Sequence, residues 1–338
     1  MVKKTIFRLT VMLLLLWCFP EVALAEKKPP DRADAPATGQ RFGAVRNERG
    51  TLWVSTGHQY GNVTYQIGGR VNDYAHGLSW DQTFPTSELT WPLNTVTGQI
   101  GAELRLGRRG ELRAFYQRNL TGHLGGKVED SDWLTQTMIP DIYSESETDF
   151  EGMTLDAGGR FWFLDRRFNG DAFLALGIGA GLMYQNFKWE ARNLDQWYPT
   201  RPEWGHDYVA GPIFTYQTKV WMPYAEIVIK SKVRRFDFAA SVSASPWMQI
   251  QDKDNHLLRA FIAKADTEGF GVKMAMEGNY HFTPRWFAGL RFNLLLFETK
   301  GVSTTIGYAG ASAGDYYDIE EKITSFQLDT MLTAGFRF

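Results

Sequence analysis

The stretch FQLDTMLTAGFRF, residues 326–338, decides the fold. Over most of its length, apolar side chains recur at every second position, and polar or small residues stand between them. This period of two is typical of a β-strand with one apolar face and one polar face. The apolar set is Phe326, Leu328, Leu332, Ala334, Phe336 and Phe338. The sequence therefore predicts a regular two-faced strand at the end of the chain.

The same alternation recurs in residues 221–229 and 286–294. The charged residues Glu226, Lys230, Arg291 and Arg337 fall on the less apolar side of these strands. An apolar exterior around a polar lumen is the pattern of a transmembrane β-barrel. After residue 25, no apolar run reaches the roughly 20 residues that a membrane helix needs. Because the lumen charges have opposite signs, we expect them to pair and to block a wide channel.

Turns and loops alternate along the chain. Short basic turns are found at 107–110, 165–168, 232–235 and 283–285. Longer, acidic and tyrosine-rich connections lie near 74–86, 126–150, 192–209, 257–263 and 300–318. Four turns and five loops require ten strands, and an even strand number is usual for a closed antiparallel barrel. The predicted strands are 60–73, 87–106, 111–126, 150–164, 171–190, 210–231, 236–252, 264–282, 286–299 and 320–338.

The predicted fold is therefore all-β, a ten-stranded antiparallel transmembrane β-barrel that extends above the outer membrane. Residues 1–25 have the charged start, apolar run and small-x-small end of a signal peptide, which contains the only cysteine, Cys18. Residues 26–55 are polar and aperiodic and are expected to form a flexible periplasmic lead-in, which leaves 56–338 for the barrel. A formal net charge of −2 gives no indication of nucleic-acid binding.

Two pairs of side chains indicate chemistry. Asp130 and Asp132 are two residues apart, as are Asp254 and His256, so each pair lies on one face of an extended strand. The predicted topology puts both pairs at the extracellular rim. Two carboxylates opposite a carboxylate–imidazole pair can hold and deprotonate a water molecule, which is hydrolysis without a serine or cysteine nucleophile.

The strand alternation conflicts with this arrangement. Carried upward from residues 112–124, the apolar phase places Asp130 and Asp132 on the lipid face, and the strand at 236–252 does the same for Asp254 and His256. A β-bulge would invert the phase. The candidate positions are Gly125-Gly126 on the first strand and Ser245-Pro246 on the second.

The chain resembles the omptin family of bacterial outer-membrane proteases. The similar segments are Val-Glu-Asp-Ser-Asp-Trp at 128–133, Asp-Lys-Asp-Asn-His at 252–256, Ser-Glu-Leu-Thr-Trp at 87–91, Leu-Met-Tyr-Gln at 182–185 and Trp-Met-Pro-Tyr at 221–224. A single Asp-x-Asp has little specificity, whereas both pairs in this order after a signal peptide are specific. The regular strand that ends on a phenylalanine also resembles the C-terminal assembly signal of outer-membrane barrels.

The resemblance implies an aspartyl/histidine endopeptidase that cleaves at basic residues. Asp130 and Asp132 would hold the attacking water, His256 would act as the base, and Asp254 would orient the imidazole ring. There is no Gly-x-Ser-x-Gly, no His-Glu-x-x-His and no cysteine after residue 25, so serine, cysteine and zinc protease chemistry lack their residues.

The resemblance also implies binding partners. Asp252 matches an acid at the base of the pocket for the basic substrate side chain, and Asp73 matches its companion. Tyr184, Lys188 and Lys219 match a site for lipopolysaccharide, which activity would require. Lysine replaces arginine at the two basic positions, so the planar bidentate contact with phosphate is lost. No metal or other cofactor is expected, and a monomer is favoured.

Other hypotheses remain open. The same scaffold could serve as a non-enzymatic adhesin or a narrow pore, with the rim acids as solvated surface. The four rim residues could instead bind a divalent metal. A lipid-modifying enzyme would need catalytic groups at the level of the membrane leaflet, and the sequence shows none. The natural substrate does not follow from the sequence.

Overall fold

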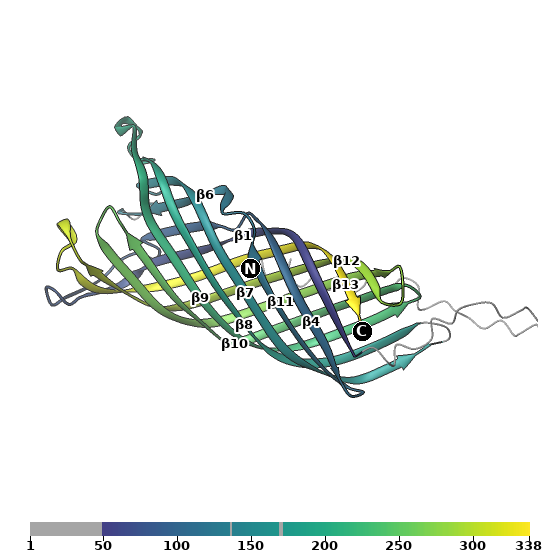
Figure 1. Cartoon of the computed structure of the whole chain (residues 1–338). Helices are drawn as coiled ribbons and strands as arrows, with labels where there is room; N and C mark the ends of the chain where they lie inside the picture. The colour runs from purple at the N-terminus through teal and green to yellow at the C-terminus, as the bar shows by residue number, and fades with distance from the viewer. Residues whose placement is uncertain (1–48, 136, 169–171) are drawn as a thin grey trace, which may run out of the picture. The chain divides into compact units, whose positions relative to one another are not determined.

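A computed structural model describes residues 49–135, 137–168 and 172–338 (Figure 1). The predicted signal peptide and residues 26–48 of the predicted lead-in lie outside the described residues. In the described part, a ring of ten antiparallel strands closes where β13 pairs with β1, which confirms the predicted fold class. The ring consists of β1 (Gly50–Asp73), β4 (Thr95–Leu106), β5 (Gly110–Asn119), β7 (Ile142–Arg167), β8 (Phe173–Trp197), β9 (His206–Val233), β10 (Phe236–His256), β11 (Phe261–His281), β12 (Trp286–Gly307) and β13 (Tyr316–Arg337).

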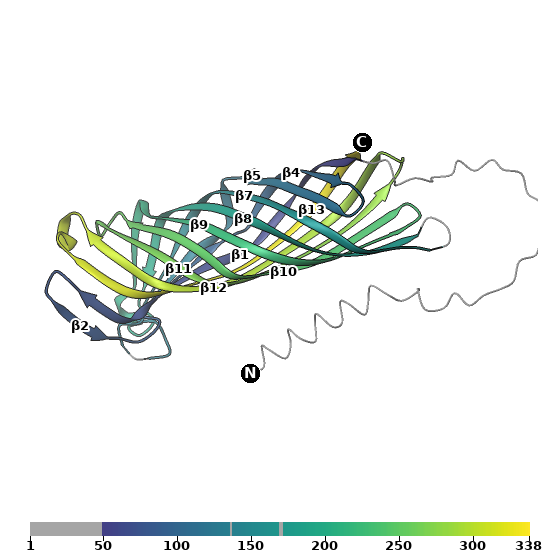
Figure 2. The same ribbon diagram turned by 90° about the horizontal axis from the view of Figure 1, so that it is seen from below.

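Three further strands build the end of the barrel that carries the long loops. β3 (Ser87–Pro92) precedes β4 and β6 (His123–Asp132) follows β5, so each predicted strand there is interrupted once. β3 pairs with β1 and β6, and β6 pairs with β7, so the wall stays closed above the interruptions. β2 (Leu78–Asp81) pairs with the end of β1, and Figure 2 shows it at the end opposite the C-terminus. Short 3-10 helices, η2 (Pro202–Trp204) and η3 (Gly310–Ser312), lie in two loops.

The strands are longer than predicted at both the N-terminus and the loops. β1 begins at Gly50 and pairs with β13 from Thr51 onward, so residues 50–55 belong to the barrel wall and not to the lead-in. The loops expected at 126–150, 192–209 and 300–318 are largely strand. These segments lack the apolar outer face of the wall below, but their backbones continue to pair with the neighbouring strands above it.

A band of exposed apolar side chains surrounds the lower part of the ring. Aromatic residues border this band at both ends, as they do at membrane interfaces. Two positions above each aromatic residue of the upper border, the next outward residue of the same strand is polar. The border aromatics are Trp221, Phe270 and Phe326 above and Phe236, Tyr280 and Trp286 below, and the polar residues above the upper border are Lys219, Glu268 and Thr324. The strand ends that carry the long loops therefore extend beyond the apolar band.

No helix among the described residues is both long and apolar enough to cross a membrane.

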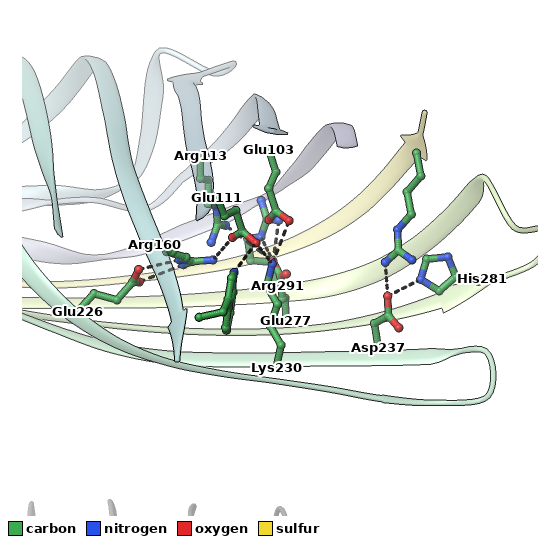
Figure 3. A network of polar contacts seen from close by, with 12 residues as sticks. Glu103, Glu111, Arg113, Arg160, Glu226, Lys230, Asp237, Glu277, His281 and Arg291 are labelled. Carbon is green, nitrogen blue, oxygen red and sulfur yellow. Dashed lines mark hydrogen bonds and ion pairs between the residues drawn. The ribbon is translucent and has the colours of Figure 1, made fainter. Parts of the chain in front are cut away.

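Ion pairs fill the lumen at the level of the band (Figure 3). The guanidinium of Arg160 donates to Glu226 at 2.7 Å and to Glu111 at 3.2 Å. Lys230 donates to Glu103 and to Glu111, both at 2.9 Å. The other two predicted lumen cations are also paired, Arg291 with Glu277 and Arg337 with Asp237.

The pairing predicted from opposite charges is confirmed. The cavities among these side chains have volumes of about 70 and 50 Å³, enough for a few water molecules. The lumen is therefore filled rather than open, which argues against a wide channel.

Candidate active site

A bulge in β10 turns Asp254 into the lumen. Below it, the residues up to Ser245 follow one inward phase, and from Met248 upward the phase is inverted. The register with β11 shifts between Ser245 and Met248, where β10 contains one extra residue. Pro246 and the exposed Trp247 occupy this position. Proline has no backbone N–H to give to a neighbouring strand, so a bulge accommodates it.

A second irregularity turns Asp130 inward. Glu111 and Gln117 on β5 face the lumen, but on β6 it is Val128 and Asp130 that are enclosed. The chain leaves the sheet between the two strands, and the register of β6 with β7 then shifts across residues 123–127, which contain Gly125-Gly126. The placement of both pairs on the lipid face was therefore wrong. The expected bulge at Ser245-Pro246 is confirmed, whereas before β6 the phase inverts between Arg118 and His123, because the shift across 123–127 adds two residues and leaves the phase unchanged.

Asp254 and His256 form a hydrogen-bonded dyad at the upper end of β10. His256 Nε2 lies 2.8 Å from Asp254 Oδ2, and the Asp254 side chain is 1 % exposed. Two aromatic rings enclose the imidazole: Phe261 at 4.3 Å between centroids with an interplanar angle of 22°, and Phe214 at 5.4 Å and 24°. The ring plane is therefore fixed by contacts on both faces, and only its edges can exchange protons.

Asp130 is half-buried, and its Oδ1 atom is enclosed. On β6 it lies opposite Leu89 of β3 and Ser144 of β7, and no donor among the described residues reaches its Oδ1. Burial raises the pKa of the Asp130 carboxyl well above its usual range, and the negative charge of Asp132 raises it further. A carboxyl whose pKa is raised retains its proton more readily, so Asp130 can donate a hydrogen bond as well as accept one.

Aromatic packing joins the two walls that carry these pairs. Trp91, two residues after Leu89 on β3, stacks on Tyr216 of β9 with centroids 5.2 Å apart and planes 13° apart. Trp91 also makes an edge contact with Phe214, at 5.4 Å and 87°. Tyr216 is the register partner of Asp254, and Phe214 that of His256. The floor of the site is thus a packed aromatic cluster, for which no role was predicted.

Asp252 lies one step below the dyad on the same face. It is 8 % exposed and accepts a hydrogen bond from the Ala265 backbone N–H at 2.9 Å. Burial raises the pKa of Asp252 to about 7. Its carboxyl group meets that of Glu321 on β13, which was not predicted as a site residue. The strand alternation places Glu321 inward with Ser325 and Gln327, but it cannot show which residue lies opposite.

Asp73 lies higher on the wall than its expected companion Asp252. It ends β1, and its Oδ2 lies 2.9 Å from Nδ1 of His76 in the turn that follows. This hydrogen bond lowers the pKa of Asp73, whose side chain is 17 % exposed. Among the described interactions, none joins Asp73 to Asp252. The register partner of Glu321 on β1 is Ile67, six residues before Asp73.

The three residues expected to bind lipopolysaccharide lie together on the outer wall. Tyr184 on β8 packs on Trp221 of β9 with ring centroids 4.5 Å apart, at the upper border of the apolar band. Lys188 and Lys219 are exposed just above this aromatic pair. The register partner of Lys219 on β8 is Asn186. The outer wall therefore presents two cations next to an aromatic pair at the height of lipid headgroups.

No group of three or more His, Cys, Asp and Glu side chains in the described part of the chain has an arrangement that could hold a metal ion. The groups that converge at the rim are instead a dyad that can accept a proton and two carboxyls that can share one. This combination supports general acid–base chemistry on a water molecule.

Comparison with known proteins gives one family and several similar solved structures. The model of the Omptin family matches residues 69–338. The outer membrane protease OmpT from Escherichia coli superposes with a TM-score of 0.67 at 16 % identity, over 87 % of this chain and 98 % of that chain. The outer membrane protein OprG from Pseudomonas aeruginosa gives a TM-score of 0.35 at 9 % identity, over 88 % and 99 % of the two chains. No curated protein matches.

The family model covers the strands that carry both side-chain pairs, and the likeness to OmpT extends over almost the whole of that protein. At 16 % identity this likeness concerns the fold, whereas the family match rests on the sequence itself. The chain is a member of the omptin family.

Proposed function

We propose that the protein is an outer-membrane endopeptidase that hydrolyses polypeptides next to basic residues. Family membership and the OmpT-like fold support a protease in the outer membrane. The observation that carries the proposal is the buried Asp254–His256 dyad, which lies across an aromatic floor from the Asp130/Asp132 pair. Both pairs lie above the apolar band, so we propose that the site faces the outside of the cell.

The proposed mechanism assigns a role to each of the four residues. A water molecule between the pairs would lose its proton to the His256 nitrogen that does not contact Asp254 and would attack the peptide carbonyl carbon. Asp254 would hold the ring and stabilise the imidazolium that forms. Asp130 and Asp132, with one proton between them, would hold the water on one side and give a hydrogen bond to the developing oxyanion. His256 would then return the proton to the leaving amine.

The proposed preference for basic residues rests on the buried carboxyl group of Asp252 below the dyad. Asp252 lies one step below Asp254 on the same inner face, where a substrate side chain that enters the lumen would reach it. A Lys or Arg head group would make charge-assisted hydrogen bonds with this carboxylate. Asp73 would contribute from the rim as a longer-range negative charge.

Lipopolysaccharide is proposed as a further partner. Tyr184, Lys188 and Lys219 would bind its phosphorylated headgroup from the outer wall. These residues lie on β8 and β9, and β9 also carries Tyr216 and Phe214 of the aromatic floor. The lipid would therefore support the wall on which the dyad packs.

The test of the proposal is digestion of an unfolded protein by the refolded barrel, with and without lipopolysaccharide. Mass spectrometry of the fragments would give the cleavage sites. We expect cuts next to Lys or Arg, and more of them when lipopolysaccharide is present. A folded barrel that leaves the protein intact under both conditions would contradict the proposal, and cuts without regard to charge would contradict the specificity.

A further inference from the structure

Two acidic side chains meet in the interior of the barrel without a cation. Asp252 comes from β10 and Glu321 from β13, and their carboxyl groups lie against each other. Glu321 is 2 % exposed, and no donor among the described residues reaches either of its Oε atoms. No ion pair involves Asp252 or Glu321 in the described part of the chain, whereas Arg160, Lys230 and Arg291 further down the lumen are each paired with an acid (Figure 3).

The surroundings of the pair add acids and hydroxyls. Tyr65 of β1 and Tyr216 of β9 face it, and Asp254 of β10 adds negative charge from above. β11 contributes the Ala265 N–H to Asp252, and β12 contributes Ser303 beside Glu321. Burial, together with the charge of Asp252, raises the pKa of Glu321 well above its usual range. Two ionised carboxylates offer only acceptors to each other, so a proton between them is what makes the contact favourable.

We propose that Glu321 and Asp252 together form the binding site for the cationic head of the substrate side chain, and that the pair holds one shared proton until this cation displaces it. The inference deepens the proposed function and rests on it. The second acid of the pocket then comes from the last strand rather than from Asp73.

The chemistry of the pocket favours a ligand with several donors and one positive charge. A Lys ammonium or Arg guanidinium would replace the shared proton as donor to both carboxyls, and the proton would leave to solvent. The rings of Tyr65 and Tyr216, which lie 5.6 Å apart between centroids at an angle of 32°, would flank the aliphatic part of the side chain. A neutral side chain of equal size cannot balance two negative charges, so the pair would keep its proton and reject it.

The experiment measures binding rather than cleavage. The probe is an acetylated hexapeptide with a central Arg whose following amide is N-methylated, which prevents hydrolysis, and the comparison peptide has neutral citrulline at the same position. Calorimetric titration of the refolded full barrel near pH 7, in two buffers of different ionisation enthalpy, gives the affinity and the number of protons released. For the parent protein we expect tighter binding of the Arg peptide and release of about one proton.

Glu321→Gln is expected to reduce the preference for Arg over citrulline about tenfold or more, because a charge-assisted contact is lost, and to abolish the proton release. Glu320→Gln is the matched control, since Glu320 is the exposed neighbour on the opposite face of β13, and it should behave like the parent. Asp252→Asn provides a second variant of the pair with the same expected losses.

Unchanged preference in folded Glu321→Gln and Asp252→Asn proteins would overturn the assignment of the pocket. Equal proton release in the parent and in Glu321→Gln, or none in the parent, would overturn the shared proton. Because the probe is not cleaved, a protein that binds the Arg peptide through Glu321 but cuts nothing would refute the protease and leave the pocket standing. If Glu321→Gln instead cleaves Arg peptides with the parent preference, the protease would stand and the assignment of the pocket would be refuted.

Discussion

Trp91 and Tyr216 stack in the barrel lumen with ring centroids 5.2 Å apart, although β6, β7 and β8 separate their strands along the wall. Each ring belongs to one half of the proposed site. Trp91 lies two residues after Leu89, the register partner of Asp130, and Tyr216 is the register partner of Asp254. Both side chains are fully buried. The stack therefore sets the spacing between the two halves of the site, and it makes the site sensitive to packing beneath it.

Loss of this stack should reduce activity and stability together. Trp91→Ala removes a buried indole from the floor, which costs about 3–5 kcal/mol of unfolding free energy where the cavity does not collapse. Trp91→Phe retains an aromatic ring and should lose much less of both. Urea unfolding and peptide cleavage would be measured on the same preparations. Full activity in a folded Trp91→Ala protein would show that the floor does not set the geometry of the site.

Phe261 should act as a positioning residue for His256. Phe261→Leu leaves the Asp254 hydrogen bond possible but opens one face of the imidazole, so we expect kcat to fall about tenfold with little change in KM. Phe261→Tyr keeps the ring and should restore most of kcat. Steady-state kinetics on both variants would decide this, and equal kcat values for Leu and Tyr would contradict the role.

Cleavage next to Arg should depend on the ionisation of Asp252. Because the pKa of Asp252 is raised to about 7, the pocket gains negative charge as pH rises from 6 to 8. The ratio of kcat/KM for an Arg peptide to that for its citrulline twin should therefore increase over this range. Titration of the catalytic groups changes kcat/KM for both peptides by the same factor, so it does not affect the ratio. A ratio that stays constant with pH would contradict a functional role for this carboxyl.

Glu321→Gln should make the barrel more stable at neutral pH. A carboxyl whose pKa is raised in the folded state binds more protons there than in the unfolded chain, so its contribution to stability falls as pH rises above the unfolded pKa of about 4. The amide removes this cost, with an expected gain on the order of 1–3 kcal/mol at pH 7.5 and little gain at pH 4. Urea unfolding at both pH values would test this. A loss of stability at pH 7.5 would mean that the Glu321 carboxylate is well solvated or paired.

The ten-stranded ring follows from alternation and turn spacing, because a strand in lipid must bury its polar face and expose its apolar one. The ends of the strands do not follow from these signals. Above the apolar band the outer face becomes polar, so the pattern of β12 weakens at Glu298 although its pairing with β11 continues to Gly307.

The site could be predicted only where neighbours along one strand carry it. The spacing of two places Asp254 and His256 on one face, and Pro246 shows where the phase inverts. The contact between Asp252 and Glu321 depends on which strands face each other across the lumen. A single sequence carries no signal for this, because any inward acid on the opposite wall would fit equally well.

The most direct test of the account is hydrolysis of a quenched fluorescent peptide with an Arg-Arg centre by refolded His256→Ala and His206→Ala barrels. His206 is the matched control, because it forms an Asp–His pair of its own with Asp195 at 2.7 Å, on the exposed hairpin of β8 and β9. We expect His256→Ala to lose at least about 10³-fold in kcat and His206→Ala to keep the parent rate. Parent-like cleavage by a folded His256→Ala protein would contradict the proposed mechanism.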